Sequence, residues 1–392
     1  MLFTSESVSC GHPDKMCDQI SDAILDEFLR QDKESKVACE CFISNNLLVI
    51  GGEAHSTATV DVIEIAKQVI REIGYNGTNG FNPDTAVYVN TLHEQSPDIR
   101  QGVDKKNESE QGAGDQGIMF GYATKQTKSY MPLEITLANE TMKAYDLLRK
   151  SGELPSACPD AKCQFTVEYS EKNPNKPIRT DTIVFSMQHR EHISVNKLFY
   201  EKTLKEYFRK VMKKVEENNP DLKKFIKAKN VLINPTGKFV IGGPEGDTGT
   251  VGRKIIVDTY GGKCPHGGGA FSSKDASKVD RSAAYYARYI AKNLVASDIA
   301  DELTIQLSYA IGVAKPISIY VDGVNLKKTK QEIVNCIYNV FNPTPYNIIK
   351  TLDLKQPIYQ KTATYGHFGN DEYTWEKLNK INEIKHYFNH NN

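Results

Sequence analysis

A glycine-rich tract constrains this 392-residue chain more than any other stretch of its sequence. It runs from residue 238 to residue 280 and reads KFVIGGPEGDTGTVGRKIIVDTYGGKCPHGGGAFSSKDASKVD. Eleven of the 27 glycines in the chain lie between Gly237 and Gly269. Glycine allows the backbone to approach a ligand closely, although ordering each glycine costs about 0.5–1 kcal/mol. We therefore expect the main chain of this tract to wrap around a ligand.

The charged side chains within the tract indicate the kind of ligand. Four cations and two carboxylates stand among the glycines: Arg253, Lys254, Lys274, Lys278, Asp247 and Asp280. Backbone donors, cations and carboxylates together are typical of a site for a polyphosphate with its metal ion. The alternative interpretation is a glycine-rich hairpin whose charges are solvated.

The bulk composition excludes several other functions. Lys and Arg balance Asp and Glu at 49 each, so no overall field directs the chain to nucleic acid or to a membrane. No stretch approaches the roughly 18 consecutive apolar residues of a membrane span, and we see no signal peptide. The eight cysteines form no CxxC pair, which argues against a cysteine metal site and favours reduced thiols. We expect a cytoplasmic protein of two or three domains.

The first motif lies where a helix is expected to begin at Pro13, a residue type that suits the first helical turn. Asp14, Asp18 and Asp22 repeat every four residues on one face of this helix. Like charges at that spacing repel each other, so we expect Asp18 and Asp22 to be solvated. Asp14 differs because it stands at a turn between His12 and Lys15. There it can hold a cation beside a phosphate-binding histidine and lysine.

Two strands at 37–44 and 47–50 form a predicted hairpin, followed by an amphipathic helix over 62–73 that ends at Gly74. Glu40 and Glu53 interrupt the apolar runs of this hairpin. Each has two interpretations that the local pattern leaves open: a functional carboxylate, or an ordinary side chain on the outer face of a strand.

Residues 95–117 form a long polar stretch, which is typical of a functional lid or of disorder. Gly112–Gly117 fits the pattern G-x-G-x-x-G, but charged and polar residues precede it where a dinucleotide-binding fold requires a buried strand. We therefore reject a Rossmann site. The chain also lacks a Walker A motif and the protein-kinase motifs.

The rest of the chain alternates strands and helices. Strands are expected at 86–90, 164–169, 181–187, 231–234, 238–242, 254–259, 302–311 and 317–322, and helices at about 138–148, 196–217, 282–296 and 330–341. A group of strands followed by a helix recurs three times without any repeat at the level of residues. This pattern predicts an α+β fold of three related domains.

Several blocks of the sequence resemble the S-adenosylmethionine synthetase family, also called methionine adenosyltransferase. They are GHPDK (11–15), GAGDQGIMFGY (112–122), DAK (160–162), NPTGKFVIGGPEGD (234–247), GRKIIVDTYGG (252–262) and GGGAFSSKDASKVDRSAAY (267–285). The likeness runs in order over essentially the whole chain. It implies three structurally related α/β domains, each a sheet with helices on one face, interleaved along the chain. We expect their bounds near 1–100 with GHPDK, 101–230 with DAK and a mobile lid loop at 95–111, and 231–392 with the glycine-rich tract.

The same resemblance implies a reaction and its components. The family makes S-adenosylmethionine from ATP and L-methionine, and releases pyrophosphate and phosphate. It uses Mg²⁺, expected here at two per site, and K⁺. It acts as a homodimer or homotetramer whose active sites are shared between subunits.

The resemblance also assigns roles to individual residues. It implies catalytic roles for His12, Lys162, Arg253, Lys254 and Lys274. It implies ATP contacts from His12, Asp160, Ala161, Lys162, Lys238, Phe239, Asp247, Arg253, Lys254, Ala270 and Lys274. Methionine contacts are expected from Glu53, Gln95, Asp115, Asp247 and Lys278, with Asp115 reaching in from the partner subunit. Asp14 and Asp280 are the expected Mg²⁺ ligands, and Glu40 the K⁺ ligand.

The residues themselves agree with this chemistry. A thioether sulfur is already a neutral nucleophile, so no Ser/His/Asp or Cys/His arrangement is required to activate it. The reaction needs alignment of the sulfur with C5′ of ATP and stabilisation of charge on the departing triphosphate. Two other classes stay open at this point. One is another ATP-dependent phosphotransferase with the same cations, and the other is a non-catalytic paralogue that binds a partner synthetase.

Four positions depart from the pattern common in the family. Lys238 replaces an arginine, Ser273 a glycine, Cys10 a glutamate, and Arg100 a neutral residue of the lid. Lys238 would contact phosphate as a point charge, because lysine lacks the planar fork of arginine. We expect modest effects on affinity or on lid kinetics.

Overall fold

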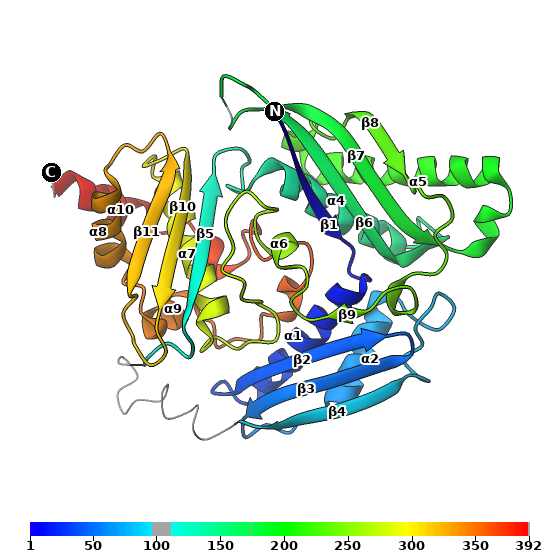
Figure 1. Cartoon of the computed structure of the whole chain (residues 1–392), viewed down its shortest axis with the longest axis horizontal. Helices are drawn as coiled ribbons and strands as arrows, with labels where there is room; N and C mark the ends of the chain where they lie inside the picture. Colours follow the sequence, from blue (N-terminus) through cyan, green and yellow to red (C-terminus); the bar gives the residue numbers. More distant parts are fainter. Residues whose placement is uncertain (96–110, 174, 391–392) are drawn as a thin grey trace.

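The computed structural model describes residues 1–95, 111–173 and 175–390. Their strands form three sheets, and each sheet includes a strand from a distant part of the sequence (Figure 1). The first has the order β1-β6-β7-β8, formed by Leu2–Val8, Ala157–Tyr169, Pro177–His189 and Ala228–Ile233. The second has the order β11-β10-β5, formed by Ser318–Val324, Glu302–Tyr309 and Gly117–Thr124. The third has the order β4-β3-β2-β9, formed by Val87–Glu94, Leu47–His55, Lys36–Ser44 and Gly249–Thr250.

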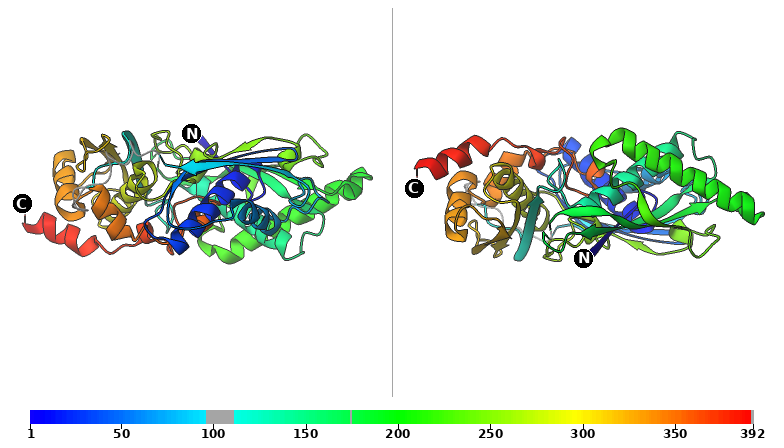
Figure 2. Two further views of the ribbon diagram at one scale, coloured as in Figure 1. Left: turned by 90° about the horizontal axis from the view of Figure 1, so that it is seen from below. Right: turned by 90° about the horizontal axis from the view of Figure 1, so that it is seen from above.

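Helices cover one face of each sheet. The longer helices are α1 (Pro13–Gln31), α2 (Val62–Ile73), α4 (Leu133–Lys150), α5 (Lys197–Asn218) and α7 (Val279–Ala296). The shorter ones are α6 (Ile255–Asp258), α8 (Lys330–Cys336), α9 (Pro345–Leu352) and α10 (Ile381–His390). α1 packs on β2, α4 on β1 and β6, and α7 on β5 and β10. The two edge-on views in Figure 2 show a flattened molecule with its helices gathered toward one side.

This arrangement confirms the predicted α+β class and the three interleaved sheet-and-helix units. β1 precedes α1 in the chain but pairs with β6, and β9 lies in the glycine-rich tract but pairs with β2. The interleaving therefore brings the GHPDK turn, the DAK strand and the glycine-rich tract to one region of the molecule.

The apolar core explains why two of these units hold together firmly. One continuous cluster of buried side chains includes α1, α2 and α7 and joins the second and third sheets. A separate cluster lies between the first sheet and the helices α4 and α5. Because α1 and α7 share one core, their polar faces are fixed relative to each other.

Local sequence signals explain most helix ends. Pro13 begins α1, and His12 accepts a hydrogen bond from the Asp14 N–H as its N-cap. The Asp61 side chain caps α2, and Gly74 ends that helix with a φ of 112°. Gly112–Gly117 leads into the strand β5, whereas a dinucleotide-binding turn leads into a helix.

Two of the predicted strands are not strands in the structure, and one predicted helix continues in a different helix type. Residues 254–259 contain the short helix α6, because positive φ angles at Gly252 and Gly261 turn the chain at both ends of this apolar run. Residues 238–242 form no described strand. The helix expected at 330–341 is α8 followed by a π-helical turn at Ile337–Phe341, which ends at Asn342 with a φ of 44°.

Membrane-spanning helices are absent from the described residues, since none of them combines the length and the apolar composition that crossing a bilayer requires.

Candidate active site

The start of α1 carries the centre of the site. His12 is buried, and its Nδ1 accepts a hydrogen bond of 3.2 Å from the Asp14 N–H. Burial and the neighbouring charges of Lys254 and Lys162 lower the pKa of His12 to about 3. The imidazole is therefore neutral near pH 7, and its proton sits on Nε2 because Nδ1 is an acceptor. His12 thus offers one N–H donor that is not used by the helix.

Asp14 connects this turn to the glycine-rich tract. Its carboxylate accepts hydrogen bonds from the Lys254 Nζ at 2.6 Å and the Thr250 N–H at 3.1 Å, and Arg253 lies 3.5 Å away. Burial alone would raise the pKa of Asp14, but the bonds from Lys254 and Thr250 outweigh burial and lower it. Gly249 is required here because a Cβ atom would overlap the Pro13 carbonyl.

Asp18 and Asp22 are not solvated, which corrects the prediction for both. They are completely buried: Asp18 accepts from the Gly252 N–H at 3.0 Å, and Asp22 from the Ser273 N–H at 3.1 Å. Arg281 also binds both oxygens of Asp22 at 2.8 Å. The expected repulsion along the helix is relieved by donors that lie more than 230 residues away in the sequence.

Lys15 also differs from its prediction. It was expected to bind phosphate beside His12, but its side chain is buried and forms ion pairs with Asp18, at 3.0 Å, and with Asp258. Burial would lower the pKa of Lys15, but these two carboxylates overcome that effect and raise it. Lys15 therefore stays charged and ties α1 to α6.

A second group of predicted residues surrounds Lys274. Its Nζ binds Asp280 at 2.6 Å, and its backbone pairs with Ala38 on β2. Ala38 lies opposite Glu53 on β3, whose Oε1 accepts a 2.9 Å hydrogen bond from the Gln95 Nε2. The buried Oε1 of Gln95 has no partner among the described residues. An ammonium group placed here would meet two acceptors.

Lys278 and Asp275 complete this second group. The Asp275 carboxylate binds Lys278 and accepts 2.8 Å hydrogen bonds from the N–H groups of Val37 and Ser277. The sequence analysis did not select Asp275, although its position three residues before Lys278 was an available signal. It fixes the segment between Lys274 and Lys278 against the start of β2.

The DAK strand supplies a third group. Asp160 is buried and accepts from the Gly243 N–H at 2.9 Å, while its Oδ1 has no described partner. Burial raises the pKa of Asp160 to about 6, and the charges of Lys162, Asp247 and Lys254 also act on it. The Ala161 N–H donates to the Ser9 Oγ at 2.8 Å, so this strand is tied to the residues just before His12.

The remaining predicted residues lie at the margins of these groups. Ala270 packs against Gly252, and Asp247 accepts a 2.8 Å hydrogen bond from the Thr248 N–H. The backbone N–H of Phe239 donates to the His189 Nε2 at 3.0 Å. Asp115 is exposed and accepts from the Gln116 N–H at 2.7 Å. Of the lid loop predicted at 95–111, residues 96–110, including Arg100, lie outside the described residues.

Three of the departures can be placed in the structure. Ser273 is buried with a φ of 82°, a backbone conformation that suits glycine better than serine. Cys10 is buried, and burial together with Asp146 raises the pKa of its thiol to about 12, so the side chain is uncharged. Lys238 is exposed and pairs with Glu191 at 2.8 Å, outside the three groups.

The donor set fits Mg²⁺ that is held together with phosphate. Among residues 1–95, 111–173 and 175–390, no three His, Cys, Asp or Glu side chains cluster as a metal cage. Asp14 and Asp280 are instead each bound to one lysine. Mg²⁺ usually binds one or two carboxylates plus substrate phosphates, so two separate acids suit it. Glu40 is exposed on β2 and pairs with no described cation.

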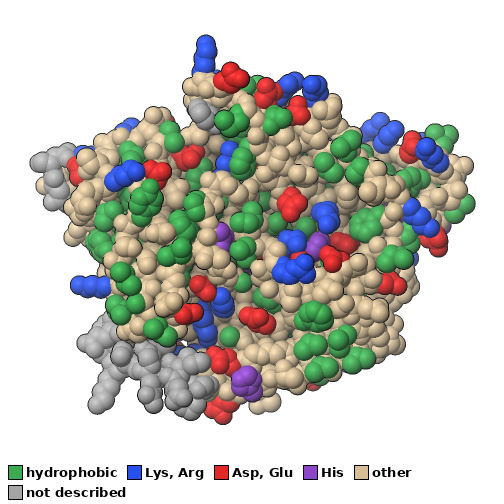
Figure 3. Space-filling model, viewed as in Figure 1, with side chains coloured by type: hydrophobic (Ala, Val, Ile, Leu, Met, Phe, Trp, Pro, Cys, Tyr) green, Lys and Arg blue, Asp and Glu red, His purple; other side chains and the backbone are tan. Residues whose placement is uncertain are grey.

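Figure 3 shows where charged side chains lie on one face of the molecule. Lys and Arg side chains gather with a histidine near the middle of this face, and acidic side chains lie next to them. Partly exposed Lys and Arg side chains, with more hydrogen-bond donors than acceptors around them, suit an anionic substrate.

Family models match nearly the whole chain. Residues 1–97, 110–239 and 241–377 match the N-terminal, central and C-terminal domains of S-adenosylmethionine synthetase. The chain belongs to the S-adenosylmethionine synthetase family. Every predicted site residue lies in one of the three segments matched to S-adenosylmethionine synthetase.

Curated relatives support the same assignment. The chain is 53% identical over 391 residues to an S-adenosylmethionine synthase of Helicobacter pylori, covering 99% of this chain and 98% of the relative. It is also 53% identical over 387 residues to an S-adenosylmethionine synthase of Mesoplasma florum, covering 98% and 99%. The similarity therefore extends over the three S-adenosylmethionine synthetase domains together.

Proposed function

We propose that this chain is a methionine adenosyltransferase, which makes S-adenosylmethionine from ATP and L-methionine and then splits the triphosphate into pyrophosphate and phosphate. The observation that carries the proposal is the match to S-adenosylmethionine synthetase over all three domains, at 53% identity to curated synthases. The geometry of the polar groups supports the individual roles.

His12 and the cations around it would act on the triphosphate. The neutral imidazole can donate its Nε2 proton in a hydrogen bond to the oxygen that leaves C5′, without any proton being transferred. Lys162, Lys254 and Arg253 lie close enough to influence His12 or Asp14 electrostatically. Their charges would stabilise the negative charge that builds up on the departing group.

The acceptors near Lys274 would hold methionine. Glu53 and the unpaired Gln95 Oε1 would accept hydrogen bonds from its ammonium group, and Lys278 would bind its carboxylate. These contacts would align the sulfur with C5′ without any base, because the sulfur is already nucleophilic. Asp247 would lie near the amino acid and the nucleotide together.

Other residues would bind the rest of ATP. The free Oδ1 of buried Asp160 is an acceptor that would suit an amino group of the base. The backbone of Ala161, Phe239 and Ala270 would line the nucleotide. Lys238 would have to leave Glu191 to reach a phosphate, which is feasible because the ion pair is exposed and therefore weak.

Asp14 and Asp280 would hold Mg²⁺, two ions per site, and Glu40 would hold K⁺. When bound, these ions neutralise phosphate charge and strengthen the hold on the triphosphate. Lys254 and Lys274 would then exchange their carboxylate partners for phosphate oxygens.

We also propose that the chain forms a homodimer or homotetramer with shared active sites, to which Asp115 contributes from the partner. Phe42, Val49 and Val89 are register neighbours on β2, β3 and β4, and Phe42 and Val89 are 38% and 39% exposed. This apolar row lies on the sheet face away from α1, which suits a second copy.

Light scattering should give at least twice the 43.9 kDa chain mass; a species at 43.9 kDa contradicts the proposal.

A cytoplasmic location belongs to the same proposal. All eight cysteines are free and buried, which suits a reducing compartment. Cell fractionation would check it, and recovery of the protein outside the cytoplasm would rule it out.

The products of the reaction distinguish this function from its alternatives. Purified protein given ATP, L-methionine, Mg²⁺ and K⁺ should form S-adenosylmethionine, pyrophosphate and phosphate, identified by mass spectrometry, and should stop when either cation is removed. ADP or a phosphorylated product would indicate the phosphotransferase. A folded oligomer without turnover would indicate the non-catalytic paralogue, which the presence of the site residues His12, Asp14, Lys162 and Lys274 already disfavours.

Replacement of His12 or Lys162 tests their part in the transition state. In the His12→Asn variant the amide can still cap α1, but the imidazole N–H is lost. Lys162→Met keeps the side-chain length without its charge. Each should lower kcat about 100-fold or more and leave the KM for methionine nearly unchanged.

The control is Lys213→Met, since the Lys213 side chain is 78% exposed on α5. This variant should keep the kcat of the wild type. A raised KM with normal kcat in the His12 or Lys162 variants would show that these residues bind substrate instead of stabilising the transition state.

A further inference from the structure

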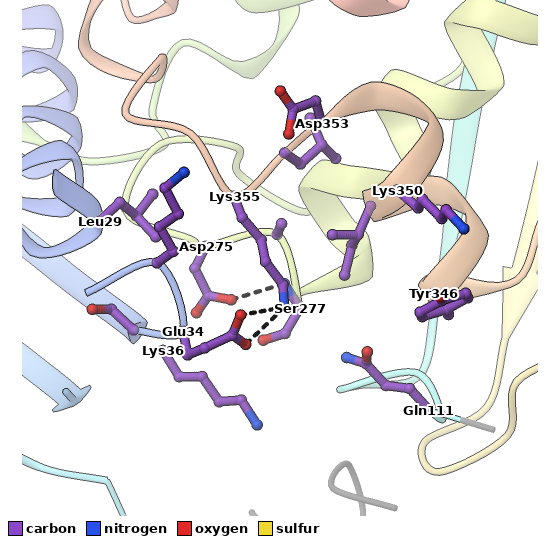
Figure 4. Close-up of a pocket in the computed structure, with 15 residues that line it drawn as sticks. Leu29, Glu34, Lys36, Gln111, Asp275, Ser277, Tyr346, Lys350, Asp353 and Lys355 are labelled. Atoms are coloured by element: carbon purple, nitrogen blue, oxygen red, sulfur yellow. Dashed lines mark hydrogen bonds and ion pairs between the residues drawn. The ribbon is translucent and has the colours of Figure 1, made fainter. Parts of the chain in front are cut away.

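A cavity of about 510 Å³ lies between the end of α1, the segment Asp275–Ser277 and α9 (Figure 4). Four parts of the chain line it: the end of α1 with the turn into β2, Gln111, the segment Asp275–Ser277, and α9 with the residues that follow it. Its volume is within the range of pockets that hold small organic molecules. Lys274 and Lys278 stand at the two ends of the Asp275–Ser277 wall, but neither lines the cavity. The cavity adjoins the second group of the site through Asp275, but no residue expected to contact ATP, methionine or a metal ion lines it.

The floor of this cavity is apolar. Leu29, Ala276, Ile349 and Leu354 line it and are at most 8% exposed. The ring of Tyr346, from the first turn of α9, stands at the side of the cavity. Burying a flat apolar ring against these side chains would contribute about 25 cal/mol per Å² of area removed from water.

The rim is basic. Lys33, Lys36, Lys350 and Lys355 line it. Lys33 makes no ion pair with any described residue, and the Nζ of Lys350 lies 5.8 Å from the centre of the Tyr346 ring. Positive charge beside an aromatic ring is suited to an anion that carries a ring of its own.

The acidic residues of the lining do not cancel this charge. The Asp275 carboxylate already binds Lys278 and accepts hydrogen bonds from two backbone N–H groups, so it is not open to a ligand. Lys355 holds both oxygens of Glu34, at 2.6 and 2.7 Å. Asp353 accepts a hydrogen bond from the Gln356 side chain. Lys33 and Lys350, which form no ion pair with a described residue, therefore outnumber Asp353, the one lining carboxylate that no cation holds.

We propose that this cavity binds a small organic anion with a flat aromatic ring. The ring lies on the apolar floor beside Tyr346, and the anionic group contacts Lys33 and Lys350. Binding at this cavity does not depend on the reaction proposed above, because no residue that lines the cavity is assigned a contact with ATP, methionine or a metal ion.

The probe for this site is 8-anilinonaphthalene-1-sulfonate, an aromatic anion whose fluorescence rises in apolar surroundings. We expect saturable binding to the full chain, and about tenfold weaker binding to the charge-reversed Lys33→Glu/Lys350→Glu variant. Tyr346→Ala should also weaken binding, because the ring loses its neighbour. Both lysines are exposed, so their replacement should leave the fold intact.

The matched control is Lys202→Glu/Lys205→Glu, which reverses two exposed lysines on α5, far from the cavity. This variant should bind the probe as the wild type does. Equal affinity of all variants would overturn the proposal, since the probe would then occupy another apolar surface, such as the open sheet faces. Absence of saturable binding to the wild type would overturn it as well.

Discussion

The site depends on a row of carboxylates along α1. Four aspartates stand four residues apart and therefore lie on one face of the helix. Each accepts hydrogen bonds from backbone N–H groups of the C-terminal half: Asp14 from Thr250, Asp18 from Gly252, Asp22 from Ser273, and Asp26 from Tyr359 and Gln360. One helix thus fixes both halves of the glycine-rich tract and the segment near the C-terminus.

Burying such a row is costly unless every charge has partners, because each carboxylate loses its water. Lys15 and Arg281 match the charges of Asp18 and Asp22, and the backbone donors satisfy further oxygens. Removing one partner of a buried pair typically costs about 3–5 kcal/mol. Asp14 differs from the inner members because its partner Arg253 is 51% exposed. At this end of the row the cations are available to a substrate, while the inner members serve to hold the tract in place.

Much of the fold could be predicted from local patterns. The starts of α1 and α2 follow from Pro13 and Asp61, and apolar periodicity located the hairpin and the long helices. The strand expected at 254–259 was wrong. The backbone turns at the glycines on both sides, and the ion pair of Asp258 with Lys15, depend on contacts that a linear pattern does not contain.

The site could be predicted only in part. The residue types and their motifs singled out His12, Asp14 and Lys274, and in the structure Asp14 binds Lys254 and Lys274 binds Asp280. The same analysis placed Asp18 and Asp22 in solvent and Lys15 in the phosphate site, because the partners at Gly252, Ser273 and Asp258 lie more than 200 residues away. Long-range ion pairs have no signature in sequence spacing, whereas Asp275 was missed although its spacing of three residues from Lys278 was visible in the sequence.

Hydrogen exchange tests the role of the aspartate row most directly. Asp18→Asn and Asp26→Asn form a matched pair, since each weakens the hydrogen bonds of one aspartate on the same helix. Asp18 binds the glycine-rich tract, whereas Asp26 binds Tyr359 and Gln360. The account predicts faster amide exchange at 249–254 in Asp18→Asn, and faster exchange at 358–361 in Asp26→Asn. Unchanged exchange of the tract in Asp18→Asn, or equal acceleration of both segments in both variants, would contradict it.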